Sequence, residues 1–322
     1  MNSYLRLFGV LVLFYGIGVV YEQYKITIND TEDLVNYDIV REFLLNDSSL
    51  ANSKKPILWI PTIYDFNSRN WENFLSRGNN NLNQPYLYIT IKSIIDNCGK
   101  DFNICLIDDN SFQKLIPNWT IDLNKIASPI KDHIRNIAML KVLYYYGGMT
   151  IPNSTLCIKN LMGLYKQGIE DCGAFIIENN SNSIVSDKMA YFPDINFMGC
   201  QKNDETIKQL IKYLEYNHSR DFTSEQDFLA IASKWCYQES LKNNITIIDG
   251  KYIGIKKCDE TPVLIEDLFS ENHIDLCNDI YAIYIPREQI LNRTKYNWFA
   301  RSSTKQILES NMAISKYMLI CN

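Results

Sequence analysis

The stretch Ser128–Thr155, SPIKDHIRNIAMLKVLYYYGGMTIPNST, decides the fold of this chain of 322 residues. Ser128 is expected to cap a helix with its side-chain oxygen, and Pro129 suits the first helical position. Helix-forming residues then run without a break to Tyr146, and Gly147 is the expected left-handed stop. The stretch therefore predicts a long helix that ends at a glycine.

Polar and apolar positions on this helix indicate what it contacts. Apolar side chains cover most of its surface, so we expect burial on more than one side. Asp132, Arg135 and Asn136 share one face near its start. A buried charge is costly unless it is paired, so this cluster is expected to face a pocket or a ligand; a purely structural Asp–Arg pair at the helix start is the alternative. Gly148 then allows a close backbone approach, and residues 149–151 predict a short buried strand.

The spacing Asp132-x-x-Arg135, followed by Leu143-Tyr-Tyr-Tyr-Gly147-Gly148, resembles the core of the DXD-sugar glycosyltransferases, which include the capsular-polysaccharide-synthesis group. That family has S-D-x-x-R, an L-x-x-Y-G-G helix end, and then a strand that carries Asp-x-Asp. The resemblance implies an α/β nucleotide-diphospho-sugar transferase fold of the GT-A kind, with a mostly parallel central sheet flanked by helices. It is strongest over residues 56–161 and covers the rest in outline.

The metal motif of that family is absent from this chain. The family's Asp-x-Asp holds a divalent metal on the pyrophosphate of the sugar donor, and its two positions align here with Pro152 and Ser154. A proline side chain has no ligand atom, Ser154 is a poor ligand alone, and the single carbonyl oxygen of Asn153 does not make a magnesium or manganese site. We therefore expect no metal at this motif, and a divalent ion only through ligands foreign to the family.

The resemblance implies that the matched helix and glycines lie by the nucleotide sugar. A second group is expected from the residues themselves, in a basic, aromatic stretch near the C-terminus, where cations can offset phosphate charge and an aromatic ring can stack on a base or sugar. For that second stretch, a solvated basic turn packed by aromatic side chains is the alternative. The expected nucleotide-sugar residues are Asp132, Arg135, Asn136, Gly147, Gly148, Asn153, Arg293, Trp298 and Arg301.

The segment Ser224-Glu225-Gln226-Asp227 resembles the D-Q-D type segment near the acceptor side of related GT-A enzymes. Asp227 or Glu225 would then act as the catalytic base or position the sugar. The alternative is a capping box at the start of a helix expected over residues 224–237, with Thr223 or Ser224 as the N-cap. The three histidines, 133, 218 and 273, stand alone in unlike contexts and receive no role.

Apolar runs alternate with helical patterns along the chain, which predicts right-handed βαβ units. Strands are expected at 56–61, 101–107, 173–178, 196–200, 245–248 and 281–285, and further helices at 83–97, 158–166, 204–216 and 304–317. Asp108 and Asp109 follow the second strand, where acidic groups can bind a ligand in an α/β fold. A turn and a cap for a helix over 111–116 is the alternative.

The N-terminus carries an apolar run, LFGVLVLFYGIGVVY at residues 7–21, and residues 4–21 nearly reach the roughly 20 residues that a membrane helix needs. An uncleaved signal anchor over residues 1–24 is favoured over a cleaved signal peptide or a buried helix. Arg6 indicates a cytosolic N-terminus and a lumenal domain, with which sequons at Asn29, Asn118 and Asn244 are compatible. Residues 25–55, with one modest helix over 33–45, read as a stem, and 56–322 as the transferase-like domain.

Composition excludes some classes of function. A net charge of −5 and a pI near 5.4 argue against a nucleic-acid protein that relies on phosphate neutralisation. Nine cysteines are spread singly, without C-x-x-C spacing, which argues against a zinc site and a disulfide framework. Most of them are expected to be small buried side chains.

Two functions follow from these observations. One is a membrane-anchored glycosyltransferase that moves a sugar from a nucleotide-sugar donor to a glycan or protein acceptor, without a metal bound at Asp-x-Asp. The other is a catalytically inactive protein of the same fold with a structural or binding role, for example in the virion of a large DNA virus. Either would be a single-pass membrane protein of the secretory pathway or of a virion.

Overall fold

The computed structural model describes residues 55–62, 84–181 and 183–321. The chain divides into two units: Met1–Ser53 with Gln113–Thr120, and Lys54–Phe112 with Ile121–Asn322. The second unit holds the elements discussed below and is described by itself; α4 (Phe112–Leu115) begins at its edge. The expected anchor over residues 1–24 and the expected stem helix over 33–45 lie outside the described residues. Within the described ranges, no helix combines the length and the apolar character that crossing a bilayer requires.

A six-stranded mixed sheet forms the centre of the second unit, in the order β2-β1-β3-β6-β5-β7. β1 is parallel to β2 and β3, and β5 is parallel to β7, whereas β6 is antiparallel to both β3 and β5. The α/β class is confirmed, and the mostly parallel sheet is confirmed in part, because β6 runs against its two neighbours. The strands are β1 (Ile57–Pro61), β2 (Asn103–Ile107), β3 (Gly148–Thr150), β5 (Ala174–Asn180), β6 (Tyr191–Cys200) and β7 (Thr246–Ile248).

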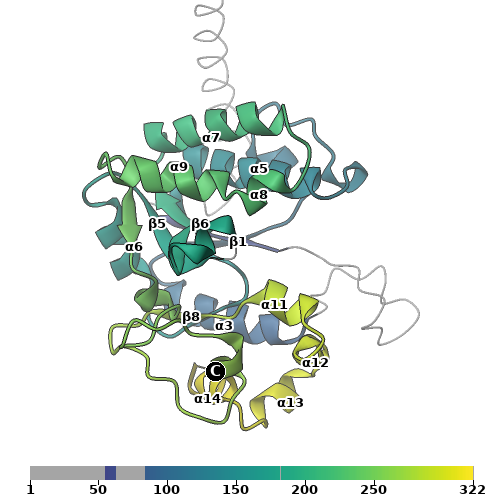
Figure 1. The fold of residues 1–322 in the computed structure, drawn as a ribbon, viewed down its shortest axis with the longest axis vertical. Coiled ribbons are helices and arrows are strands. Elements are labelled where there is room, and N and C mark those ends of the chain that lie inside the picture. Colours follow the sequence, from purple (N-terminus) through teal and green to yellow (C-terminus); the bar gives the residue numbers. More distant parts are fainter. Residues whose placement is uncertain (1–54, 63–83, 182, 322) are drawn as a thin grey trace, which may run out of the picture. The chain divides into compact units, whose positions relative to one another are not determined.

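Helices cover both faces of this sheet, as Figure 1 shows. On one face lie α5 (Ile130–Tyr146), α7 (Glu205–His218) and α9 (Ile231–Ser240), and on the other lie α3 (Tyr86–Cys98) and α6 (Met162–Ile169). Side chains of β1 alternate between the two layers. Leu58 and Ile60 join the core with α3 and α6, whereas the Trp59 ring meets Tyr146 of α5 at a centroid distance of 5.6 Å. β1 is therefore covered on both sides, as its apolar run predicts.

The start of α5 differs from the sequence prediction. Pro129 occupies the N-cap position, and no side chain caps the helix. Instead, the Pro129 carbonyl accepts hydrogen bonds from the amides of Asp132 (3.0 Å) and His133 (3.1 Å). The predicted Ser128 cap is wrong, because backbone carbonyls already satisfy these amides of the first turn.

The two glycines after α5 fix its connection to the sheet. Gly147 has a φ of +70° and donates its amide to the Leu143 carbonyl at 2.7 Å, so it ends the helix as expected. Gly148 has a φ of +95°, and a Cβ there would lie 2.1 Å from the Ile57 carbonyl oxygen. Only glycine fits this approach of β3 to β1.

Two helices expected from the sequence are each broken in two. Residues 224–237 form α8 (Glu225–Phe228) and α9, because Ala230 between them takes the left-handed conformation with a φ of +52°. Residues 304–317 form α13 (Thr304–Leu308) and the start of α14 (Ala313–Cys321). Here the Ser310 hydroxyl donates to the Ile307 carbonyl at 2.7 Å and competes with helical pairing. The helix expected over 158–166 begins four residues late, at Met162.

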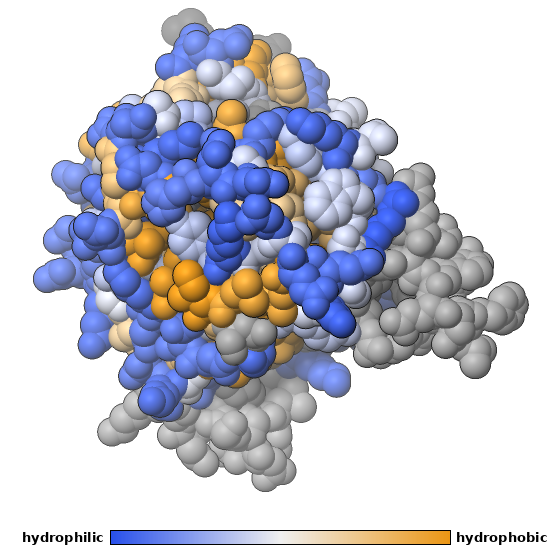
Figure 2. All heavy atoms as spheres, turned by 90° about the horizontal axis from the view of Figure 1, so that it is seen from below, coloured by the Kyte–Doolittle hydropathy of each residue, from blue (hydrophilic) through white to orange (hydrophobic). Residues whose placement is uncertain are grey.

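The C-terminal part of the chain forms a second core around α3. β8 (Ala282–Tyr284) pairs antiparallel with β4 (Thr155–Cys157), and this two-stranded sheet leads into the last helices. α10 (Ile265–Leu268), α11 (Arg287–Asn292), α12 (Asn297–Arg301), α13 and α14 pack their apolar side chains on Tyr86 and Leu87 of α3. Figure 2 shows a hydrophobic band across the face of the molecule seen from below. Leu319 and Ile320, at the end of α14, are among the exposed large apolar residues.

Candidate functional site

A cavity of about 320 Å³ lies where β5, β6, α5, α7 and the α8–α9 break meet. Most residues that line it are polar, and their side chains carry amide, hydroxyl, carboxylate and imidazole groups. Such groups hydrogen-bond to hydroxyl-rich ligands in either direction. The residues of the lining on which the site depends are Asn136, Asn180, Asp194, His218, Gln226 and Asp227.

A β-bulge in β6 shapes one wall of the cavity. Ile176 of β5 pairs with Met198, but the next residue, Ile177, pairs with Asp194, so the intervening residues of β6 bulge out of the ladder. The Asp194 carboxylate accepts hydrogen bonds from the Asn179 side chain at 2.7 Å and from the Asn196 amide at 2.9 Å. The carboxylate therefore stabilises the bulge. Bulges beside functional sites commonly redirect a side chain.

The short helix α8 provides another wall. The Gln226 side chain is buried, and its Nε2 donates to the carbonyls of Asn217 (3.0 Å) and Asp221 (3.1 Å). Ser224 makes no capping hydrogen bond with its side chain; instead, the Thr223 hydroxyl accepts from the Glu225 amide at 3.2 Å. The alternative interpretation is therefore confirmed in part: Thr223 accepts at the helix start, whereas the Gln226 side chain donates to Asn217 and Asp221 and does not complete a capping box.

Two histidines that are far apart in sequence lie together beside the cavity. Packing of α7 on α5 stacks the rings of His133 and His218 at a centroid distance of 4.1 Å. His133 Nε2 lies 2.9 Å from Asp227 Oδ2; the His133 side chain is 2% exposed and that of Asp227 is 56% exposed. Burial, followed by the positive charge of His133, lowers the pKa of His218. The expectation that the histidines stand alone is wrong for these two, because packing of α7 on α5 stacks their rings.

Two buried polar atoms of the cavity lining, Asn180 Oδ1 and Ser181 Oγ, have no hydrogen-bond partner among the described residues. His218 Nδ1 and Gln226 Oε1 miss the geometry of a full hydrogen bond, but their two side chains interact with each other. Gln226 as a residue is only 5% exposed. A buried polar atom without a partner costs about 1–3 kcal/mol. Atoms of this kind that gather around one cavity indicate a site for a hydrogen-bonding ligand.

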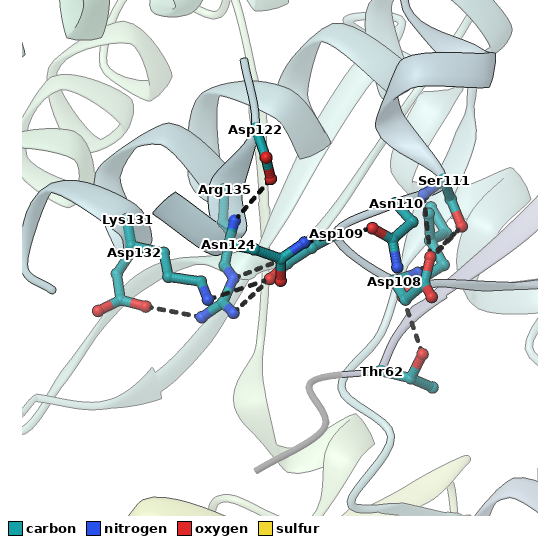
Figure 3. A network of polar contacts seen from close by, with 11 residues as sticks. Thr62, Asp108, Asp109, Asn110, Ser111, Asp122, Asn124, Lys131, Asp132 and Arg135 are labelled. Carbon is teal, nitrogen blue, oxygen red and sulfur yellow. Dashed lines mark hydrogen bonds and ion pairs between the residues drawn. The ribbon is translucent and has the colours of Figure 1, made fainter. Parts of the chain in front are cut away.

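A separate polar network holds the start of α5, as Figure 3 shows. Arg135 donates from Nε and NH2 to the two carboxylate oxygens of Asp109, at 2.7 and 2.6 Å, and from NH1 to Asp132 at 3.0 Å. Lys131 lies 3.5 Å from the same Asp109 carboxylate. Burial favours a higher pKa for Asp109, but the contacts with Arg135 and Lys131 outweigh burial and lower it. Asp108 accepts from the Ser111 amide at 2.9 Å, as the turn alternative predicts.

The structure brings only part of the predicted site to the cavity. Asn136 and Asp227 line it, whereas Glu225 does not. Asp132 and Arg135 belong to the network at the helix start, and the two glycines lie at the junction of α5 with β3. The backbone carbonyl of Asn153 accepts from the Thr90 hydroxyl at 2.6 Å, beneath α3.

The predicted residues of the C-terminal stretch lie apart from this cavity. Arg293 pairs with Glu266 at 3.1 Å. Trp298 packs against Phe269 and Phe299, and Arg301 ends α12. From this region the cavity lining includes only Glu288 of α11, which sequence reasoning missed, as it missed Asp194 and Gln226. Tertiary contacts bring these three residues to the cavity, so the local spacing of the sequence does not predict them.

The positions that align with Asp-x-Asp do not fit a metal ion. Ser154 is 1% exposed, and its carbonyl accepts from the Ile285 amide at 3.0 Å, beside β8. Pro152 offers no side-chain ligand. Across the described residues, no group of three or more His, Cys, Asp or Glu side chains is placed to hold a metal. The nine cysteines are free thiols, of which four are buried, so the expectation that most are buried is wrong.

Comparison with known proteins gives a distant similarity in structure. No protein-family model matches the chain, and no curated protein matches it in sequence. A solved structure titled "PaToxG Glycosyltransferase" is similar at 13% identity and a TM-score of 0.35; the match covers 66% of this chain and 80% of that one. A likeness of this size does not bear on the chemistry of the site.

Proposed function

We propose that this chain is a membrane-anchored glycosyltransferase that holds a sugar unit in the cavity and transfers it from a nucleotide-sugar donor to a glycan or protein acceptor. The observation that carries the proposal is the cavity itself, with unpartnered donors and acceptors around a volume of about 320 Å³. A hexose presents several hydroxyl groups that both donate and accept, which suits such a lining. The motif Asp132-x-x-Arg135 with Gly147-Gly148 agrees with this proposal.

In the proposed reaction, Asp227 is the base. Its carboxylate is exposed at the cavity, and Nε2 of the buried His133 lies 2.9 Å from its Oδ2. Asp227 takes the proton from an acceptor hydroxyl as that oxygen bonds to the anomeric carbon of the donor sugar. The bond between the anomeric carbon and the phosphate oxygen breaks, and the nucleoside diphosphate leaves with the electron pair. No step uses a metal at Pro152 and Ser154, because these positions do not fit one.

The test measures release of nucleoside diphosphate from a panel of nucleotide sugars by the full-length chain in detergent. We expect release with at least one donor, and its loss in Asp227→Asn with the same melting temperature as the wild type. Asp259→Asn is the matched control, because Asp259 lies in an exposed turn, where it bonds to Thr261. If Asp227→Asn and Asp259→Asn behave alike, Asp227 is not the base.

One observation favours a second candidate function, a carbohydrate-binding protein without transferase activity. Transfer requires positive groups that stabilise the departing diphosphate. Arg135 already donates to both Asp109 and Asp132, and Lys131 lies beside Asp109. Sugar binding without diphosphate release from any donor would favour this second candidate over the transferase.

A further inference from the structure

The charged groups of the cavity lining are of one sign. Asp194 of β6, Asp227 of α8 and Glu288 of α11 all contribute carboxylates, and among the described residues no lysine or arginine side chain lines the cavity. Its one imidazole, His218, has a pKa lowered by burial and by the neighbouring His133, which favours the neutral form. Three carboxylates from three separate elements therefore surround the space in which the ligand lies.

The surroundings of these carboxylates offset their charge unevenly. Asp227 faces His133, and Asp194 accepts from the amide groups of Asn179 and Asn196. Glu288 lies at the rim; the surrounding protein, followed by the negative charge of Asp194, raises its pKa, while the adjacent Arg287 opposes this rise. A positive group between Asp194 and Glu288 would offset the repulsion between them.

We propose that the sugar unit bound in this cavity carries a free, protonated amino group, so that the ligand is an amino sugar and not a neutral hexose. The inference rests on the proposed function, because it specifies the sugar that the same cavity holds. The ammonium lies between Asp194 and Glu288, and the hydroxyl groups meet the unpartnered atoms of Asn180 and Ser181. These two atoms, at the end of β5, are independent of the carboxylates.

The experiment compares four probes by titration calorimetry with the full-length chain in detergent: glucosamine, glucose, N-acetylglucosamine and ethanolamine. Glucosamine carries both the ring and the charge, whereas each of the other three lacks the charge or the ring. Hydrogen bonds to charged groups are stronger than neutral ones. We therefore expect glucosamine to bind about tenfold more tightly than glucose, a difference of about 1.4 kcal/mol, and ethanolamine to bind more weakly than glucosamine.

The variant Glu288→Gln tests the origin of this preference. The substitution keeps the size of the side chain and removes its charge. Because Glu288 is exposed, we expect the variant to fold. We expect the preference for glucosamine over glucose to fall at least several-fold. Glu309→Gln is the matched control, because Glu309 is exposed on the surface beside Lys305. Asp194→Asn is a second variant, with its melting temperature measured, since Asp194 also holds the bulge.

The outcomes separate this inference from the function on which it rests. If glucose and glucosamine bind equally, the amino-sugar inference is overturned and sugar binding stands. Equal binding of ethanolamine and glucosamine also overturns it, because charge alone would then explain the affinity. If none of the three sugars binds, the proposed function itself fails. An unchanged preference in Glu288→Gln contradicts the assigned position of the ammonium.

Discussion

Replacing Gly148 with alanine tests whether the glycine pair serves the sheet or a ligand. The added Cβ would lie 2.1 Å from the Ile57 carbonyl oxygen, so β3 and β1 would have to separate by roughly 1 Å to restore normal contact. Alanine would also have to keep a φ of +95°. A non-glycine residue in such a region costs about 1–3 kcal/mol.

Separation of the strands adds to this cost. Leu58 pairs with Met149 and Trp59 with Thr150, and the Ile151 amide donates to the Trp59 carbonyl at 3.1 Å. Weakening two of these buried hydrogen bonds adds about 1 kcal/mol each. The total is about 3–5 kcal/mol, which lowers the melting temperature of a domain of this size by roughly 10 °C.

Differential scanning calorimetry of the full-length chain measures this shift, and sugar titration is run in parallel. Gly163→Ala is the control: in α6 its added Cβ meets the hydroxyl end of Tyr281, a side chain that can move, so we expect little change. A melting temperature within 2 °C of the wild type, combined with lost ligand affinity, would refute the reasoning. Gly148 would then be a binding residue, as its motif resemblance implies.

Three further predictions concern charge, metal and membrane. Asp109→Asn should destabilise the chain by about 1–3 kcal/mol, and Asp132→Asn by less, because the Asp132 side chain is half exposed. The folded-state pKa of Asp109 lies below the unfolded value of about 3.9. The stabilisation by Asp109 is therefore present above that pH and is lost as the pH falls through the folded-state pKa. Urea midpoints measured down to pH 3 should fall less in Asp109→Asn than in the wild type, and parallel curves would contradict the pairing. Affinity for a nucleoside diphosphate sugar should be equal in manganese and in EDTA, and a tenfold loss in EDTA, about 1.4 kcal/mol, would point to a metal site with other ligands. The full-length chain should stay in the membrane fraction after a carbonate wash and carry glycan on at least one of Asn29, Asn118 and Asn244; release by carbonate would exclude the anchor.

The parts of the fold that local sequence determines were predictable. β1 is a short apolar run between prolines, and α5 is a long run of helix formers that ends at Gly147; both have strong local signals. The break at Ala230 was not predictable, because an alanine carries no preference for the left-handed conformation. Neither was the Ser310 break, because the Ser310 hydroxyl also contacts the Ser315 hydroxyl of α14 at 2.7 Å, a contact that no local propensity encodes.

The candidate site was predictable only where its residues lie near a motif. Asn136 and Asp227 were found through the helix face and the acidic segment. His133 meets Asp227 only because α5, α7 and α8 pack together, and no spacing encodes that meeting. Arg135 was expected to pair with Asp132, but its bidentate partner is Asp109, because the end of β2 lies beside the start of α5. Long-range pairs of this kind depend on topology and not on periodicity.

The bulge in β6 has a consequence for how the ligand preference of this fold can change. On either side of the bulge, β6 keeps its pairing with β5, while Ile195 and Asn196 lie on the cavity wall outside that pairing. Substitutions at these two positions therefore reshape the wall without shifting the register of the sheet. Sequence drift or engineering can therefore alter the proposed ligand site at little cost to folding, provided that Asp194 continues to hold the bulge.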